Sequence, residues 1–268
     1  MSGRVLSIVA ALAGSLLLLF LIAPVLGLVG GAGPGGVRGA FGDAEVRGAL
    51  GLTLVTALGA VTVGVLAGTP VAWFLARRRF RGRAVLAAII DLPLLIPHPV
   101  AGIALLLVLG RNTPAGGALL EMGIRIIGTP LGIIAAMLFV SVPLYVSGAR
   151  EAFARVDPRY EGVARTLGER PWRVFRRVTL PLASRGLAAA AIVMWARAVS
   201  EFGAIVIIAY HPRVASVLIY DRFATFGLSA ALPAAAALVI VALVPLVMLR
   251  VLHAEPGLGE TRHDSGPQ

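Results

Sequence analysis

Arg197 and Glu201 are the residues of this sequence whose types and spacing most clearly suggest chemistry. They lie four residues apart in the segment WARAVSEFGA, inside a stretch that is otherwise largely apolar. Four residues is about one helical turn, so the two side chains share a helix face and can form an ion pair. Such a pair either neutralises itself inside a helix bundle or lines a polar pathway, where Ser200 and Gly203 would let neighbouring helices approach closely.

The remaining polar residues show no pattern typical of an enzyme. The four histidines, at positions 98, 211, 253 and 263, belong to no recognisable serine motif, and no group of Asp, Glu and His has metal-ligand spacing. Cysteine is absent, so we expect no thiolate metal site, and we expect no bound cofactor. The chain also contains no lysine, which a Walker A nucleotide site requires. Any ATP chemistry must therefore belong to a partner.

These residues lie in a strongly apolar chain. Of its 268 residues 58% are hydrophobic and 14% charged, and the mean hydropathy is +0.91, whereas soluble domains have roughly 45–50% apolar and about 25% charged residues. Stretches near the ~20 apolar residues that a bilayer requires predict an all-α polytopic membrane protein. The six expected transmembrane helices run from Val5 to Leu28, Ala49 to Ala76, Ala84 to Gly110, Ile126 to Ala149, Gly186 to Ala209 and Ala230 to Leu249.

This count predicts one membrane domain with two extensions. We expect the first helix, with the N-terminus, over residues 1–29, a core of five helices over 49–252 and a polar tail over 253–268. The first stretch is longer than a typical signal-peptide core and has no clear cleavage site, so we interpret it as a retained helix. The expected location is the cell membrane.

The arginines indicate how the chain is oriented. Five of the 24 fall in RRRFRGR at 77–83 and nine lie between Arg150 and Arg185, whereas the other loops between helices hold two each. By the positive-inside rule both arginine-rich loops are cytoplasmic, and so are both termini. The net charge of +11 then follows the membrane topology and does not indicate a nucleic-acid partner.

The larger arginine-rich loop, residues 151–182, contains a pattern of two short helices, which we call the coupling unit (residues 157–181). Asp157 can cap the first helix, Pro158 suits its first position, and Gly168 can end it. A second helix is expected to start at Pro171 and to stop at Pro181. The first helix carries an apolar stripe, and the second an aromatic edge and a basic face. This pattern favours a docking element; an ordinary basic loop that contacts lipid headgroups is the alternative.

The coupling unit resembles the cytoplasmic loop signature of ABC importer permeases, which is EAA, three residues, glycine, nine residues and I-x-L-P. Here it takes the form Gly162-Val163-Ala164, Gly168 and Val178-x-Leu180-Pro181, with Glu161 displaced by one position from the usual glutamate. The resemblance implies that the unit sits in a groove on a separate ATP-hydrolysing subunit. The residues implied in this coupling are Glu161, Ala164, Gly168, Trp172, Leu180 and Pro181.

A narrower resemblance covers most of residues 50–230. The segment SEFGA is similar to the GEFGA stretch of molybdate, tungstate and sulfate permeases, and residues 91–110, 139–159 and 205–228 resemble the tungstate/molybdate branch most. The resemblance implies a type I importer bundle, two ABC ATPase subunits, a second copy of the chain and an extracytoplasmic oxyanion-binding protein. That protein would dock on the outer loops at 30–48, 111–125 and 210–229. Arg197, Ser200, Glu201 and Gly203 would line the pathway or its gate.

Three other readings stay open at this stage. A sulfate importer subunit is the nearest alternative. A gradient-driven anion transporter would need membrane carboxylates, for which Glu201 and Asp91 are the candidates. A membrane enzyme would need a paired nucleophile and base, and the sequence shows no such pair.

Three prolines around His98 (Pro93, Pro97 and Pro99) predict a bend or a break in the third helix, with His98 as a packed polar residue.

Overall fold

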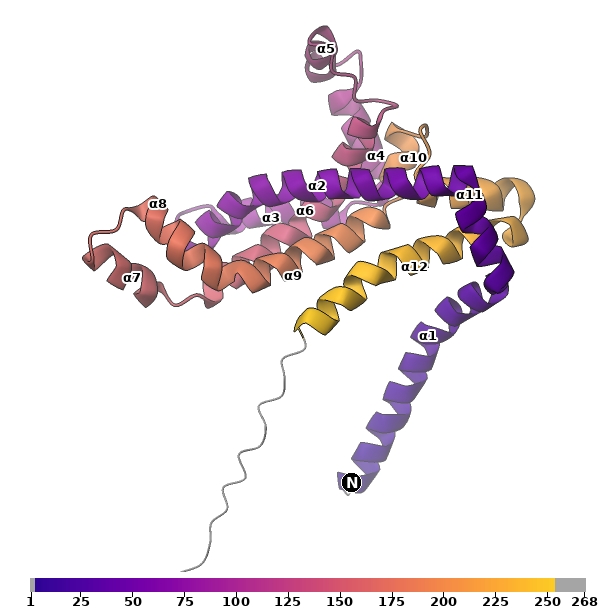
Figure 1. Ribbon diagram of the computed structural model, residues 1–268. Helices are drawn as coiled ribbons and strands as arrows, with labels where there is room; N and C mark the ends of the chain where they lie inside the picture. Colours follow the sequence, from indigo (N-terminus) through magenta and orange to yellow (C-terminus); the bar gives the residue numbers. More distant parts are fainter. Residues whose placement is uncertain (1–2, 254–268) are drawn as a thin grey trace, which may run out of the picture.

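The computed structural model describes the backbone of residues 3–253 and the side chains of residues 4–243. All regular elements in this range are helical (Figure 1). The long helices α2 (Ala44–Arg77), α6 (Pro130–Arg155) and α9 (Leu180–Val199) run roughly side by side, with the coupling unit at one end of this bundle and α11 (Ala215–Phe226) at the other. From residue 254 on, the expected polar tail lies outside the described residues.

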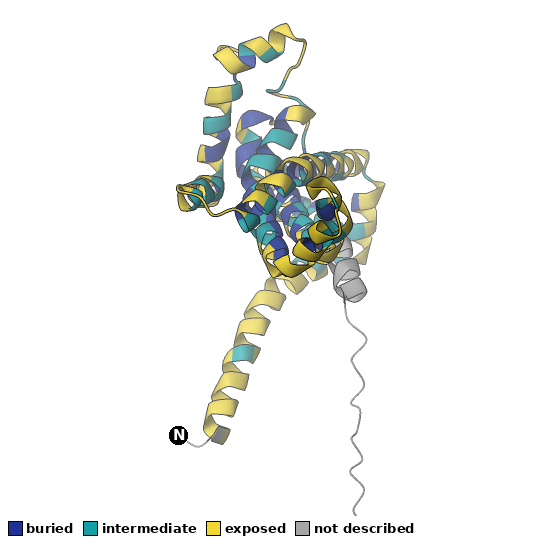
Figure 2. Ribbon diagram, turned by 90° about the vertical axis from the view of Figure 1, so that its left-hand side faces the viewer, coloured by how far each residue is buried: buried dark blue, intermediate teal, exposed yellow. Residues whose placement is uncertain are grey.

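Three helices form the core of the bundle: α2 (Ala44–Arg77), α6 (Pro130–Arg155) and the helix that ends as α9 (Leu180–Val199). Small residues allow them to pack closely. A Cβ added at Gly148 would lie 2.9 Å from the Cβ of Ala190, and one added at Gly186 would lie 2.5 Å from that of Ala152. Figure 2 shows buried residues gathered in the middle of the bundle, and many of those on these three helices are alanines. Small residues therefore form much of the packing surface.

α1 (Gly3–Gly42) is longer than the expected first helix and bends at Gly33, where φ is +65°. Most of its residues are exposed (Figure 2), including a long series of large apolar ones, and it packs mainly against α12 (Leu228–His253). A helix that is apolar on all sides is typical of contact with lipid or with another membrane helix.

Two of the six expected helices are interrupted. The expected span from Ala84 to Gly110 is two helices, α3 (Arg83–Leu95) and α4 (His98–Leu109), bent by 114°. The break falls at Ile96–Pro97, because the proline disfavours a helical residue before it and supplies no amide proton. The bend or break predicted from the prolines around His98 is thus confirmed. The expected span from Gly186 to Ala209, in contrast, was wrong as a single helix. It ends as α9 at Val199 and resumes as α10 (Gly203–Ile208).

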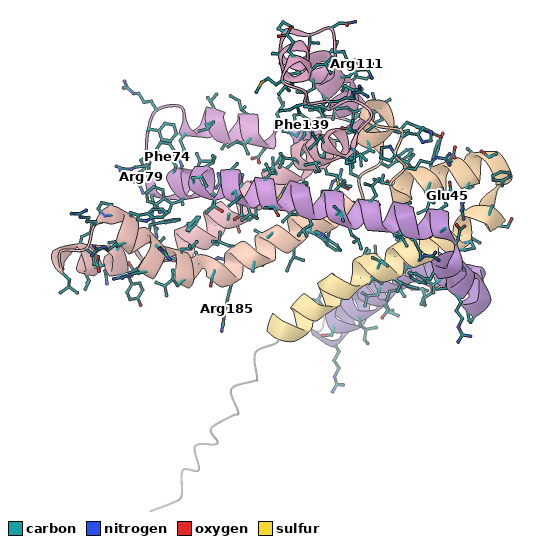
Figure 3. All side chains as sticks on the ribbon, turned by 45° about the horizontal axis from the view of Figure 1, so that its top comes forward. Glu45, Phe74, Arg79, Arg111, Phe139 and Arg185 are labelled. Atoms are coloured by element: carbon teal, nitrogen blue, oxygen red, sulfur yellow. The ribbon has the colours of Figure 1, made fainter. Side chains whose placement is uncertain are left out.

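Four helices in the described range are long and apolar enough to cross a membrane, or five if α3 and α4 count as one span. The sixth expected span coincides with α12, whose apolar part in this range, Leu228–Leu243, is shorter. The short helix α5 (Pro114–Glu121) follows α4. In Figure 3 Arg79 lies toward the coupling unit and Glu45 toward the opposite end, so charged groups mark both ends of the bundle.

Candidate functional site

The first half of the coupling unit has the predicted structure. α7 (Pro158–Thr166) begins at Asp157, whose carboxylate accepts a hydrogen bond from the Arg159 amide at 2.8 Å. The helix ends at a turn in which Gly168 has φ +85°. The Gly168 amide donates to the Arg165 carbonyl at 3.0 Å, so the turn closes back on the helix.

The second half differs from the prediction at Pro181. α8 (Pro171–Val174) starts as expected, but a π-helical turn, η1 (Phe175–Thr179), follows it and leads directly into α9. Pro181 lies in the first turn of α9 and does not stop the helix. The Leu180 amide donates to the Phe175 carbonyl, five residues back. A π-turn leaves a carbonyl without its usual partner, and a proline, which has no N–H, suits that position.

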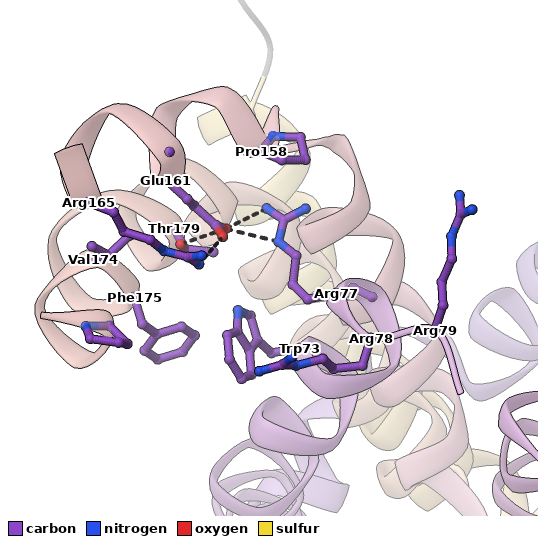
Figure 4. Close-up of a pocket in the computed structure, with 13 residues that line it drawn as sticks. Trp73, Arg77, Arg78, Arg79, Pro158, Glu161, Arg165, Val174, Phe175 and Thr179 are labelled. Carbon is purple, nitrogen blue, oxygen red and sulfur yellow. Dashed lines mark hydrogen bonds and ion pairs between the residues drawn. The ribbon is translucent and has the colours of Figure 1, made fainter. Parts of the chain in front are cut away.

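Glu161 faces inward and anchors the coupling unit to α2 (Figure 4). Its Oε1 lies 2.8 Å from Nη2 of Arg77 and accepts a hydrogen bond from the Thr179 hydroxyl at 2.9 Å. Arg77 also donates to the Val156 carbonyl at 3.0 Å, and Arg165 lies 3.5 Å from Glu161 Oε2. Glu161 is buried and Arg77 is largely covered, with side chains 7% and 12% exposed, so the pair fixes the position of α7 relative to α2.

The opposite face of the coupling unit is apolar and open. Tyr160, Val163, Leu167 and Trp172 are between 60% and 80% exposed. Ala164 and Leu180 are half-buried, and Pro181 is exposed. Trp172 stacks on Phe175 with ring centres 5.8 Å apart, and Phe175 meets the edge of Trp73 at 5.5 Å. A row of rings therefore connects the exposed face of the coupling unit to α2.

Arg197 and Glu201 form the predicted ion pair, with Arg197 Nη2 2.8 Å from Glu201 Oε2. Glu201 nevertheless lies outside the helix, one residue beyond the Ser200 cap of α9. Its carboxylate is 1% exposed, and its Oε1 accepts a hydrogen bond from the Ala204 amide at 2.8 Å. Glu201 thus accepts a hydrogen bond from the first turn of α10 and neutralises Arg197 at the same time.

His98 is a member of this cluster that sequence reasoning treated only as a packed polar residue. Its Nδ1 lies 3.4 Å from Glu201 Oε2, and Arg197 Nη2 lies 2.8 Å from its Nε2. Gly203 packs against the same turn, since an added Cβ there would lie 2.7 Å from the His98 Cβ. The His98 side chain is 44% exposed and that of Arg197 22%, whereas Glu201 is buried. The cluster joins both helix breaks and exposes its nitrogen-bearing groups.

The other candidate carboxylate, Asp91, lies outside the cluster and accepts a hydrogen bond from the Ser147 hydroxyl at 3.2 Å. Among the residues that the structure describes, no three His, Asp or Glu side chains are grouped so that they could hold a metal ion.

Ion pairs join the elements at the other end of the bundle. Arg222 on α11 contacts Asp43 at 2.6 Å and Glu45 at 2.8 Å, both at the start of α2, and Arg213 contacts Asp221 at 2.7 Å. The hydrogen bond from Arg222 lowers the pKa of Asp43 below its usual value. These contacts tie together parts of two of the loops expected to face outward.

Comparisons with known proteins agree with this architecture. Residues 64–255 match the family described as "Binding-protein-dependent transport system inner membrane component". The chain is 41% identical to the molybdate/tungstate transport system permease protein of Thermococcus kodakarensis over 78% of this chain and 80% of that protein. It is 37% identical to a probable molybdenum ABC transporter permease of Haloferax volcanii, over 91% and 89% of the two chains. A sulfate transport system permease of Synechocystis is 33% identical over 81% and 80%.

Solved structures with the same fold are permeases of ABC importers. A bacterial ABC transporter that imports alginate aligns with a TM-score of 0.71 at 19% identity, over 93% of this chain and 95% of that one. The methionine transporter MetNI, in an inward-facing conformation, aligns with a TM-score of 0.59 at 15% identity, over 77% and 92%. The predicted all-α, type I importer fold is confirmed. The chain belongs to the family of binding-protein-dependent transport system inner membrane components, and it is a membrane-embedded permease subunit.

Proposed function

We propose that this chain is the transmembrane subunit of an ATP-driven importer of tungstate and molybdate. The observation that carries the proposal is the coupling unit: its glutamate is anchored inside the chain, and its apolar side chains are exposed for a partner. Two copies of the chain would enclose the pathway. Two ABC ATPase subunits would bind on the cytoplasmic side and an extracytoplasmic oxyanion-binding protein on the outer side.

The relatives support the choice of substrate. Permeases named for molybdate/tungstate transport are 33–43% identical to this chain, and three of them reach 41% or more. Permeases named for sulfate transport are 33–34% identical. All three anions are tetrahedral and doubly charged, so a sulfate importer is the alternative within the same architecture.

Coupling would pass through the coupling unit. Trp172, Ala164, Leu180 and Pro181 would meet the ATPase groove, and Gly168 would shape the turn that enters it. Glu161 would act from inside, because its ion pair with Arg77 makes α7 and α2 move as one body. Closure of the ATPase dimer would then move a core helix of the bundle, as in rigid-body switching of other proteins.

The cluster around Arg197 would form part of the pathway or its gate. Its buried carboxylate and exposed nitrogen-bearing groups would offer a passing dianion a weak contact. Ser200 and Gly203 lie at the break between α9 and α10, where a small change in backbone angles would move α10 relative to α4. The tight selection of the anion would occur in the binding protein.

The proposed topology places both termini in the cytoplasm of a cell whose inner or plasma membrane holds the protein. The permease core would extend over residues 49–252, with the first helix separate from it. The exposed apolar surface of α1 supports a contact with lipid or with the second copy.

ATP hydrolysis in proteoliposomes tests the proposal. The chain is reconstituted with its ATPase, and its binding protein is added empty or loaded with tungstate, molybdate or sulfate. We expect tungstate and molybdate forms to stimulate hydrolysis and the empty form to have little effect. Stimulation by the sulfate-loaded form alone would identify sulfate as the substrate in place of tungstate and molybdate. Failure of the ATPase to bind the chain would refute the proposed role of the coupling unit.

A further inference from the structure

A cavity of about 580 Å³ opens between the end of α2 and the coupling unit (Figure 4), and the transport cycle proposed above makes no use of it. Its charged lining consists of four arginines and one glutamate: Arg77, Arg78, Arg79, Arg165 and Glu161. A concave surface with this excess of guanidinium groups attracts anions, because its walls limit the screening of charge by water.

The glutamate offsets only part of this positive charge. Glu161 Oε1 already accepts hydrogen bonds from Arg77 and Thr179, each at 2.9 Å, and its Oε2 lies 3.5 Å from Arg165. Arg78 and Arg79, in contrast, form no ion pair and no side-chain hydrogen bond within the described residues. Figure 4 shows Arg78 beside Trp73 and Arg79 farther out, so Arg78 is the free cation closer to the interior.

The wall of the cavity also contains a donor without an acceptor. The indole Nε1 of Trp73 is buried and has no hydrogen-bond partner in the described part of the chain. In Figure 4 this nitrogen points toward the Glu161 cluster. Buried polar groups without partners are rare, and each calls for an explanation such as a ligand or an ordered water.

We propose that this cavity binds a tetrahedral oxyanion, either a phosphate group or a free dianion of the molybdate type. Arg78 would bind it through a charge-assisted hydrogen bond, Trp73 would donate its N–H, and Arg165 would supply charge from the other wall. Since Trp73 lies near the end of α2, Arg78 directly follows that helix and Arg165 lies in α7, the bound anion would hold the coupling unit against α2. The anion could come from a phospholipid headgroup or from solution.

Equilibrium dialysis with radiolabelled phosphate tests the site in the full chain, held without any ATPase in nanodiscs of digalactosyldiacylglycerol, a bilayer lipid that carries no phosphate. Trp172→Phe and Trp195→Phe leave Trp73 as the only tryptophan of the three, so its emission reports where the anion binds. We expect saturable binding together with a change in Trp73 emission, and no such change with sodium chloride at equal ionic strength. Because no transport is measured, the result is independent of the proposed function.

Two arginines of the same loop provide a matched comparison. Arg78→Gln should weaken phosphate binding by about tenfold or more, since a charge-assisted hydrogen bond is lost. Arg81→Gln removes the same charge from the same loop at a position that does not line the cavity, and it should leave binding within about twofold. Equal losses in both variants, absence of saturable binding, or binding without a change in Trp73 emission would overturn the proposal.

A second lipid composition distinguishes the two sources of the anion. If nanodiscs with phosphatidylglycerol shift Trp73 emission by themselves and abolish phosphate binding, the ligand is a lipid headgroup. If phosphate binding persists in them, the ligand is a free anion, and molybdate should compete with phosphate. Both results support an oxyanion site.

Discussion

Replacing Gly168 with valine should uncouple the ATPase from the permease while leaving the membrane bundle intact. Gly168 has φ +85°, and a Cβ added there would meet no atom within 4 Å. The variant therefore suffers no collision, and its cost lies in the backbone alone. A β-branched residue held in this region costs roughly 1–3 kcal/mol. At about 2 kcal/mol the native turn loses a factor of about 30 relative to other turn conformations.

The assay is ATP hydrolysis stimulated by the loaded binding protein in proteoliposomes. We expect Gly168→Val to lower this stimulation by about tenfold or more, because the hydrogen bonds from the Gly168 and Glu169 amides that close the turn, at 3.0 and 3.1 Å, require the native conformation. Gly168→Asn is the matched control, since asparagine tolerates positive φ, and it should keep most of the stimulation. Size-exclusion chromatography verifies that both variants insert and assemble. Full stimulation in an assembled valine variant would refute the reasoning.

Three further predictions concern the anchor, the pathway and the outer loops. Glu161→Ala leaves Arg77 without its counter-charge, and breaking a buried ion pair costs about 3 kcal/mol. Proteolysis of the loop at residues 151–182 should therefore become faster. An unchanged rate would contradict the anchoring role of Glu161. Gly203→Ala should reduce anion uptake, because the added Cβ would lie 2.7 Å from the Cβ of His98. Gly51→Ala is the control: no atom lies within 4 Å of its added Cβ, so uptake should not change. The hydrogen bond from Arg222 lowers the pKa of Asp43 in the folded protein. The contact therefore stabilises the outer loops fully at any pH above the ordinary aspartate pKa of about 3.9. This stabilisation is lost as the pH falls through the lowered pKa, because the carboxylate then takes up a proton. Hydrogen exchange should therefore distinguish wild type from Asp43→Asn at pH 5–7, and the difference should shrink below about pH 4; a difference that is constant into acid would contradict the assignment.

Local signals were sufficient for the first half of the coupling unit. The Asp157-Pro158 start and the Gly168 turn depend on residues within a few positions of each other, and the structure has both. The row of exposed apolar residues on α7 was also visible in the sequence, because it follows helical periodicity. The family signature then indicated what such a unit docks on.

Contacts between distant residues account for what the sequence did not predict. Glu161 turns inward because of Arg77, which is 84 positions away and gives no local signal. The break after α9 lies in an apolar segment without proline, where Glu201 accepts a hydrogen bond from α10 and the His98 turn packs against Gly203. The π-turn before Pro181 likewise has no sequence pattern of its own, and without it the proline predicts a helix stop.

Anion accumulation in proteoliposomes is the most direct test of the account. Liposomes containing the chain and its ATPase are loaded with ATP and given tungstate-loaded binding protein outside, with no ion gradient and no membrane potential. The account predicts that labelled tungstate accumulates inside above its external concentration, and that a non-hydrolysable ATP analogue abolishes the accumulation. Equal uptake with the analogue, or uptake that requires an imposed ion gradient, would contradict an ATP-driven importer and favour the gradient-driven alternative.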